Sequence, residues 1–107
     1  MTRNTQNLSV EIVRFVDNWQ PGWVACEFLD AENNRHTLVD KVPMFTDELL
    51  ASKSAYPRPG AVRCEVLQRW QDVRGRELAR VSTERPDTVE SAEGRSQFVV
   101  FSTQLSD

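Results

Sequence analysis

The chain has 107 residues, of which 39% are hydrophobic and 27% are charged, and its formal net charge is −3. This length supports one domain with one hydrophobic core that needs neither metals nor many disulfides. No stretch is long and apolar enough to span a membrane, and neither half is polybasic, with a net charge of −4 over residues 1–50 and +1 over residues 51–107. The composition therefore argues against a membrane protein and against strong non-specific DNA binding.

The first residues show no hydrophobic signal-peptide region, which predicts a cytoplasmic protein. Eleven of the 13 basic residues are arginine, a balance that indicates a GC-rich bacterial genome. Cys26 and Cys64 both lie in apolar strand patterns, and in the cytoplasm we expect them to be reduced. A disulfide between them is the alternative.

Three strands are expected before residue 42, after a frayed segment over residues 1–7. They are Leu8–Val16, Trp23–Asp30 and Arg35–Lys41. The first is apolar on both faces, which predicts a strand that is covered on both sides or that bends round a corner. In the second, alternation places Val24, Cys26 and Phe28 on the core face. Turn-forming residues occupy 17–22 and 30–34.

A short helix over Thr46–Ser52 is predicted between the third and fourth strands. Thr46 is a suitable N-cap, and acids follow it in the first turn, where they favour the helix dipole. Phe45 and Leu50 have the spacing of a hydrophobic staple. Residues 54–60 hold two prolines and a glycine, which predicts an irregular path into the next strand.

A β-hairpin over residues 61–83 has the clearest pattern in the chain. Strands Ala61–Trp70 and Arg76–Thr83 flank the turn Asp72–Gly75. A four-residue loop would place Val66 opposite Val81, whereas a three-residue loop with a Gly75 bulge would place it opposite Ser82. We expect the four-residue loop, because it keeps one face of the hairpin apolar.

The remaining chain is expected to form a mobile surface loop over residues 84–95 and a final buried strand, Gln97–Leu105. The whole chain, residues 1–107, then forms a single mainly β domain. Strand spacing and turn chemistry predict a small antiparallel six-stranded barrel or sandwich, with one short helix between strands 3 and 4. The last strand should pair with an early one, since closure removes exposed edges.

Catalytic and metal-binding patterns are weak. His36 is the only histidine, and a Cys–His site with Cys26 or Cys64 and Asp40 would lack a local signature. A zinc site would need four ligands, and no paired cysteine motif is present. None of the four glycines forms a phosphate-binding loop. We therefore predict a protein that is not an enzyme and that uses no cofactor or metal.

Aromatic residues in or beside turns are the strongest candidates for a binding site. Trp19, Trp23 and Tyr56, with Arg58 close to the last of them, could anchor a protein partner. The alternative is that Trp19 and Trp23 fold back and cap the core, since Trp is highly buried on average. Trp70 falls on the apolar face of its strand, which predicts a structural role.

These features predict a non-catalytic protein-interaction module, such as an inhibitor, an immunity-type protein or an accessory subunit, without identifying its partner. The alternative is a small barrel that binds single-stranded nucleic acid through Arg63, Arg69 and Arg80, which share one face of the expected hairpin. That face could equally be a solvated surface with cross-strand charge pairs. The acidic net charge favours the interaction module.

Overall fold

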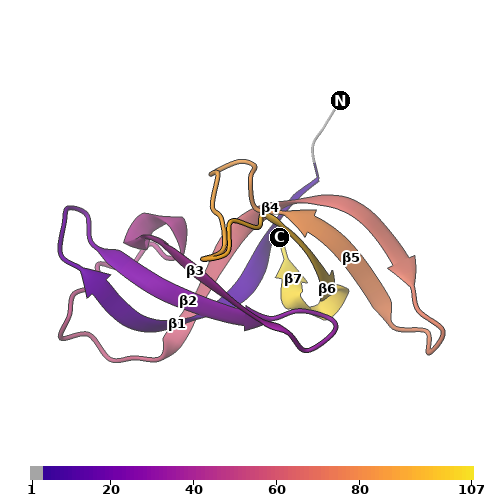
Figure 1. Ribbon diagram of the computed structural model, residues 1–107, viewed down its shortest axis with the longest axis horizontal. Helices are drawn as coiled ribbons and strands as arrows, with labels where there is room; N and C mark the ends of the chain where they lie inside the picture. Colours follow the sequence, from indigo (N-terminus) through magenta and orange to yellow (C-terminus); the bar gives the residue numbers. More distant parts are fainter. Residues whose placement is uncertain (1–3) are drawn as a thin grey trace.

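The computed structural model describes residues 4–107 and shows one antiparallel sheet that curls into a half-barrel (Figure 1). Alternating apolar residues over short runs form the strands, as the sequence predicts. The strands are β1 (Thr5–Asp17), β2 (Trp23–Leu29), β3 (Arg35–Lys41), β4 (Arg58–Gln71), β5 (Glu77–Ser82), β6 (Gln97–Phe101) and β7 (Leu105–Ser106). Two 3₁₀ turns complete the set, η1 (Val42–Met44) and η2 (Ser102–Gln104).

The sheet has the strand order β3-β2-β1-β4-β5-β6, and β1 is its central element. The C-terminal part of β1 pairs with β2, and its N-terminal part pairs with β4. The two-residue strand β7 returns to pair with β1 at Asn7 and Leu8. The predicted return of the last segment to an early strand is therefore found, but the barrel is open, because β3 and β6 do not pair with each other.

Two loops lie between the unpaired strands β3 and β6. The backbone N–H of Ala31, in the β2–β3 turn, donates to the carbonyl of Val99 in β6 at 2.8 Å. The N–H of Ala92 donates to the carbonyl of Thr37 in β3 at 2.8 Å. The predicted loop over residues 84–95 is confirmed as a loop, but its Val89 is fully buried in the core. The mobility of this loop stays a prediction.

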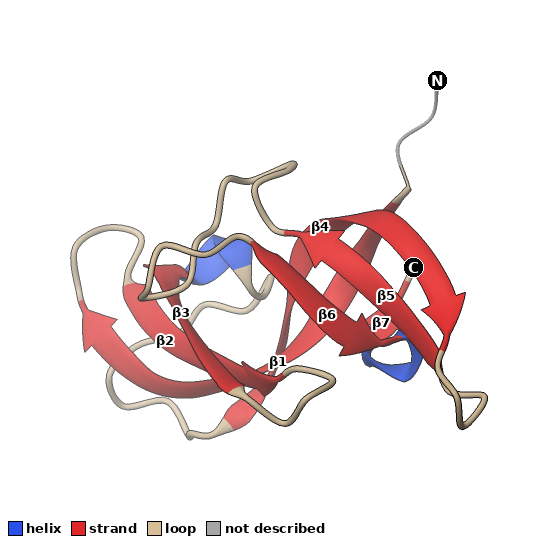
Figure 2. Ribbon diagram, turned by 45° about the vertical axis from the view of Figure 1, so that its right-hand side comes forward, coloured by secondary structure: helices blue, strands red, loops and turns tan. Residues whose placement is uncertain are grey.

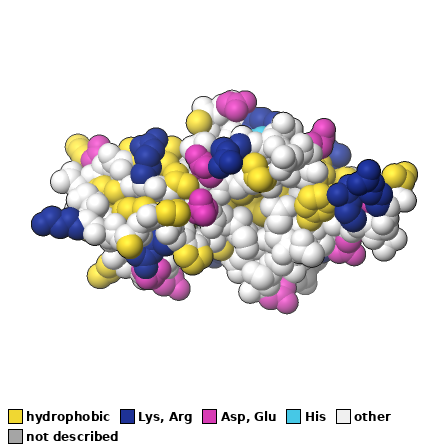
Figure 3. All heavy atoms as spheres, turned by 90° about the horizontal axis from the view of Figure 1, so that it is seen from below, with side chains coloured by type: hydrophobic (Ala, Val, Ile, Leu, Met, Phe, Trp, Pro, Cys, Tyr) yellow, Lys and Arg dark blue, Asp and Glu magenta, His cyan; other side chains and the backbone are white. Residues whose placement is uncertain are grey.

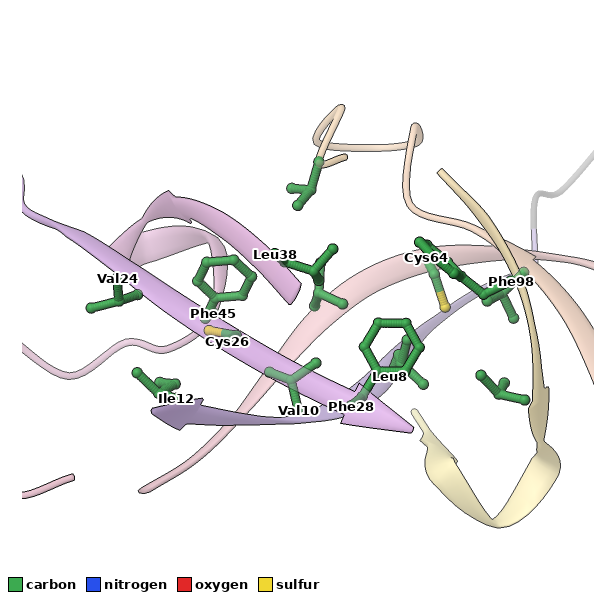
Figure 4. Close-up of a cluster of buried hydrophobic side chains, with 14 of the residues drawn as sticks. Leu8, Val10, Ile12, Val24, Cys26, Phe28, Leu38, Phe45, Cys64 and Phe98 are labelled. Carbon is green, nitrogen blue, oxygen red and sulfur yellow. The ribbon is translucent and has the colours of Figure 1, made fainter. Parts of the chain in front are cut away.

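The hydrophobic core is one continuous cluster that lies in the concavity of the curled sheet. Figure 4 shows it running from Val24 and Ile12 at one end to Cys64 and Phe98 at the other. Val24, Cys26 and Phe28 are buried, as alternation along the strand predicts. Phe28 and Phe98 meet edge to face, with ring centroids 5.1 Å apart, and so join β2 to β6 across the core.

Gly60 in β4 pairs with Val10 of β1, and a larger residue there would force its neighbours to move. A Cβ at this position would lie 2.8 Å from Cδ1 of the fully buried Ile12 and 3.1 Å from the carbonyl oxygen of Phe45. We expect Gly60→Ala to lower the free energy of unfolding by about 1–3 kcal/mol, the usual cost of overpacking. Urea denaturation measures it.

The matched control for Gly60→Ala is the double variant with Ile12→Val, which removes the Cδ1 atom in closest contact. The two substitutions should be coupled, so that their combined loss is smaller than the sum of the single losses. Strict additivity would contradict the proposed clash.

The predicted helix over Thr46–Ser52 is wrong, because the chain turns and bends there (Figure 2). The Thr46 hydroxyl does accept the N–H of Glu48, as a cap would, but side chains then take up the backbone groups that a helix would pair. Ser54 accepts the N–H of Ala51, and the Tyr56 hydroxyl donates to the carbonyl of Ala51. A helix this short has little stability of its own, so these local bonds and the burial of Leu50 decide the path.

Both ends of the chain also differ from the sequence prediction. Fraying was expected over residues 1–7, but β1 begins at Thr5 and pairs with Glu65 in β4; residues 1–3 lie outside the described part. The prediction of one last strand over Gln97–Leu105 is wrong as well. This segment divides into β6, the turn η2 and β7, and this turn redirects the chain from β5 to β1.

The β4–β5 hairpin contains both of the registers that the sequence allowed. At its tip the loop is the shorter one: Asp72 N–H bonds to the Arg76 carbonyl, and Gly75 takes the positive φ of 77° that suits a bulge. The prediction of a four-residue loop is therefore wrong. A register shift between Val66 and Gln68 then restores Val66 opposite Val81, as predicted from burial.

This register shift exchanges the two faces of β4 beyond Leu67. Arg69 pairs with Ala79, which is fully buried, so Arg69 lies on the core side near the end of the half-barrel. Trp70 pairs with Leu78 on the opposite face. The prediction that Trp70 faces the core is therefore wrong, because one extra residue reverses the alternation along the strand.

Candidate functional site

The turn between β1 and β2 holds Trp19 at its tip in a fixed conformation. The Asp17 carboxylate accepts the backbone N–H of Trp19 at 2.9 Å, and the N–H of Gly22 donates to the Trp19 carbonyl. Gly22 has a φ of 98°, which favours glycine at this point. These bonds order the turn without covering the indole.

The indole of Trp19 is 77% exposed, and it forms a hydrophobic surface with two neighbours. Val16 is 42% exposed, and Trp23, half-buried, begins β2. The three side chains and Asp17 line a groove of about 370 Å³. In Figure 3, hydrophobic side chains lie among charged ones over this end of the molecule, which the hairpin shares with the loop that follows η1. We call Val16, Trp19 and Trp23 the hairpin surface.

Cations border the hairpin surface. Lys41 is opposite Trp23 in the β2–β3 pairing, and its ammonium group lies 5.9 Å from the indole centre, within range of a cation–π contact. Arg14 and Val39 both pair with Ala25, on the same face of the sheet. Their larger side chains flank Ala25, which is only 1% exposed.

Tyr56 and Arg58, the other two candidates from the sequence, serve the chain's own structure. The Tyr56 hydroxyl bonds to the Ala51 carbonyl at 2.7 Å, and its ring packs against the core. The Arg58 guanidinium forms an ion pair with Glu48, while its buried Nε atom has no hydrogen-bond partner. Neither residue lines the groove of the hairpin surface.

A partly buried Asp30–His36 pair lies at the base of the β2–β3 turn. His36 is 4% exposed, and its ring packs against the rings of both Phe28 and Phe98. Its Nε2 is 2.7 Å from Oδ2 of Asp30. Because an ionised carboxylate only accepts, Nε2 carries the proton and donates it. The other carboxylate oxygen accepts the backbone N–H groups of Glu32 and Asn34.

These contacts set the protonation state of Asp30. Its burial raises the pKa, but the hydrogen bonds from His36, Asn34 and Glu32 and the charge attraction to His36 outweigh this, so the pKa lies below its ordinary value. The free His36 nitrogen, Nδ1, is buried without a partner, and Asp30 rather than His36 lines the adjacent surface groove. This orientation suits a structural role, because a catalytic imidazole needs its free nitrogen at the substrate.

The Cys–His site considered from the sequence is not assembled. His36 bonds to Asp30 and not to Asp40. Cys26 and Cys64 are buried and free, so the alternative of a disulfide between them is not found. Burial raises the pKa of the Cys26 thiol to about 12 and that of Cys64 to about 11, which keeps both protonated at neutral pH.

The described residues contain no group of three or more His, Cys, Asp or Glu side chains that could hold a metal ion. Over the same part of the chain, no helix has the length and apolar character needed to cross a membrane.

The structure separates the three arginines of the nucleic-acid alternative. Arg63 makes a two-pronged ion pair with Asp87 of the 84–95 loop. Arg69 lies on the core side and bonds to Gln6, Ser102 and Glu77. Arg80 remains on the outer face of β5, with no hydrogen bond or ion pair to any residue of 4–107. The predicted shared face is therefore wrong for Arg69, which the register shift at Leu67 turns to the core side, whereas Arg63 and Arg80 both remain on the outer face.

Sequence reasoning missed several residues of these sites. Val16 was assigned only to a strand, although its place one residue before the turn signalled that it would share the hairpin end with Trp19. The Asp30–His36 pair was missed because Asp40 was considered instead. Asp30 precedes the turn and His36 follows it, and residues that flank a hairpin turn lie side by side.

Comparisons with known proteins assign neither a family nor a fold. The chain matches no protein-family model, no curated protein and no solved structure. The class of the protein therefore rests on its geometry: an open antiparallel half-barrel with an exposed aromatic hairpin.

Proposed function

We propose that this chain is a non-catalytic protein-interaction module, in the manner of an inhibitor, an immunity-type protein or an accessory subunit, and that its partner docks on the hairpin surface. The observation that carries this proposal is the 77% exposure of Trp19 on an ordered turn, beside Val16 and Trp23. Trp is among the residues that most often dominate binding energy at protein interfaces. Its exposure on an ordered turn, at the centre of a hydrophobic surface, is typical of a docking site.

The rigidity of the turn supports the same proposal. The Trp19 N–H donates to the Asp17 carboxylate and the Trp19 carbonyl accepts from Gly22, which fixes the backbone around Trp19, so binding loses little backbone entropy. The Lys41 ammonium group lies 5.9 Å from the centre of the Trp23 indole, where it supports the ring by a cation–π contact. A hydrophobic side chain of the partner could fill the groove of about 370 Å³ that the hairpin surface and Asp17 line.

We further propose that the module acts in the bacterial cytoplasm. Two unpaired, buried cysteines suit a reducing compartment. The dominance of arginine over lysine supports a GC-rich bacterial source.

Substituting Trp19 with Ala should weaken partner binding at least thirtyfold, the loss of about 2 kcal/mol or more that defines a central interface residue. The partner is first isolated from native host lysate with the unaltered protein, with and without nuclease. Calorimetry then measures its affinity for each variant. Because Trp19 is exposed, the free energy of unfolding should change by no more than about 0.5 kcal/mol.

Leu49→Ala is the matched control, since Leu49 is a 99% exposed hydrophobic residue outside the hairpin surface. It should leave the affinity unchanged. Full binding by both Trp19→Ala and Trp23→Ala would exclude the hairpin surface as the docking site. Equal losses from Trp19→Ala and Leu49→Ala would point to non-specific hydrophobic contact.

A further inference from the structure

The outer face of β4, β5 and β6 carries a second surface, which exists only because of the register shift at Leu67. Paired residues share a face, so the strands form two rows across the sheet. One row is Gln68, Arg80 and Val99, and the next is Trp70, Leu78 and Phe101. We call these six residues the outer surface. It combines an arginine, an amide and two aromatic rings, and contains no acid.

The charge of this half of the molecule is opposite to that of the whole. Residues 58–82 and 95–101, which comprise β4, its turn, β5, β6 and the two residues before β6, contain seven arginines and three acids, a net charge of +4. The whole chain carries −3, so the remaining residues carry −7. Such segregation creates a local positive potential on a protein that is acidic overall.

Two of these arginines are available to a ligand at one groove. Arg80 and Arg95 line a groove of about 390 Å³ along Ser96–Val99 of the β6 side. Neither has a carboxylate partner within residues 4–107, whereas Arg58, Arg63, Arg69 and Arg76 each have one. Arg95 lies over the ring of Phe98 at 5.6 Å, which holds its guanidinium beside the groove. The groove therefore offers two forks suited to anionic oxygens.

A second groove continues along the same strand. Phe101, Ser102 and Thr103 line it together with Glu77 and Arg76, and the Arg76 guanidinium is 5.0 Å from the centre of the Phe101 ring. The Glu77 carboxylate is paired with Arg69. The volume of this groove is about 390 Å³. The two grooves follow β6 from residue 96 to residue 103, with the outer surface beside them. At the end formed by the β4–β5 hairpin, Figure 3 shows basic side chains next to hydrophobic ones.

We propose that the outer surface binds single-stranded nucleic acid, independently of the hairpin surface. Arg80 and Arg95 contact phosphates, and bases stack on Trp70 and Phe101. Gln68 donates hydrogen bonds to base edges. Aromatic rings beside a positively charged groove are the arrangement by which strand-binding proteins hold nucleic acid. An acidic protein segment could satisfy the two arginines, but it gives no role to the aromatic row, so nucleic acid fits more of the surface.

The two sites lie in different halves of an elongated molecule that is 44 Å long (Figure 1). The β1–β2 hairpin forms one end, and the β4–β5 hairpin forms the other. A failure of one proposal therefore leaves the other intact.

The test is fluorescence anisotropy with labelled 12-nucleotide oligo-dT and oligo-rU, between 20 and 200 mM NaCl. We expect binding to the full chain at low salt and at least a tenfold loss in the double variant Arg80→Ala/Arg95→Ala. The slope of log affinity against log salt should become shallower by about 1.4, the value for two phosphate contacts to a single strand. Circular dichroism confirms that each variant is folded.

The control is Arg74→Ala/Arg85→Ala, which removes the same charge from two exposed arginines that line neither groove. It should retain affinity within about threefold. Stacking is tested in the variant Trp19→Phe/Trp23→Phe, where Trp70 is the remaining tryptophan: its fluorescence should be quenched when oligo-dT binds. Retained binding without quenching would remove Trp70 from the site.

Three results would overturn the proposal. The first is no binding at 20 mM NaCl, and the second is an equal loss in the groove and control variants. The third is tighter binding of a labelled 12-residue poly-glutamate peptide than of either oligonucleotide, which would assign the groove to an acidic protein segment.

Discussion

Phe98→Ala should lower the free energy of unfolding by about 3–5 kcal/mol, the largest loss that we expect from one substitution. Phe98 is 2% exposed, meets Phe28 edge to face at 5.1 Å and lies 4.8 Å from the His36 ring. It belongs to β6, which has no paired strand on its open side, so the truncation leaves a cavity and removes the contact that holds β6 against β2. Guanidinium denaturation measures the loss, and thermal unfolding should move down by at least about 10 °C.

Val99→Ala is the control for Phe98→Ala, because Val99 is the next residue of the same strand and lies on the outer face. It is only half-buried, and its truncation should cost less than about 1.5 kcal/mol. If the two losses were equal, β6 would not present Phe98 to the core.

Asp30→Ala has the second largest expected effect, a loss of about 3 kcal/mol in the free energy of unfolding. The substitution removes the acceptor of two backbone N–H groups and the partner of His36 Nε2. His36 would then be buried with neither ring nitrogen bonded, since Nδ1 already has no partner. The β2–β3 turn, which reaches Val99 through Ala31, should open. Amide exchange of Ala31 reports this opening.

Asp30→Asn separates the charge of this carboxyl from its shape. The folded-state pKa of Asp30 lies below its ordinary value, so the folded protein binds fewer protons there than the unfolded chain. The carboxylate therefore stabilises the fold above its unfolded pKa, and that contribution is lost as the pH falls toward the folded pKa. The advantage of the natural protein over Asp30→Asn should shrink as the pH falls below about 5. A constant difference between pH 7 and pH 3 would contradict this linkage.

The prediction from sequence succeeded where one local pattern decided the structure. The bounds Arg35–Lys41 of β3 agree with the sequence prediction, and β2 differs from it by one residue. Alternation is a property of a single strand, so it could be recognised without knowledge of the neighbouring strands. The capping signal at Thr46 was real, but the helix prediction failed because local hydrogen bonds from Ser54 and Tyr56 and the burial of Leu50 set a different path.

The hairpin shows where local patterns conflict. Turn chemistry favoured a short loop with Gly75 as a bulge, and burial favoured Val66 opposite Val81. The strand registers that these two patterns require differ by one residue. The structure meets both by inserting an extra residue at Leu67, which is 44% exposed and tolerates the irregularity. No rule applied to one strand at a time could place that insertion.

The candidate sites divide in the same way. Their residue types could be read from the sequence: Trp19 and Trp23 beside a turn, and many arginines after residue 57. A count of charge over the expected strands, instead of over halves of the chain, would also have found the positive region. Three features could be known only from the fold. They are the exposure of Trp19, the pairing of Asp30 with His36, and the residues that surround Arg80 on the outer face.

By itself the sequence determined the class, a mainly β domain built from short antiparallel strands, together with most strand positions and the turn that carries Trp19. The tertiary structure alone decided that the barrel stays open and that Arg69 and Trp70 exchange faces. It also decided that Arg80 has no acidic partner among residues 4–107. The physical reason is the distance along the chain over which each interaction acts. Alternation and turn chemistry act between neighbours in the chain, whereas register, closure and ion pairing depend on residues that only the folded sheet brings together.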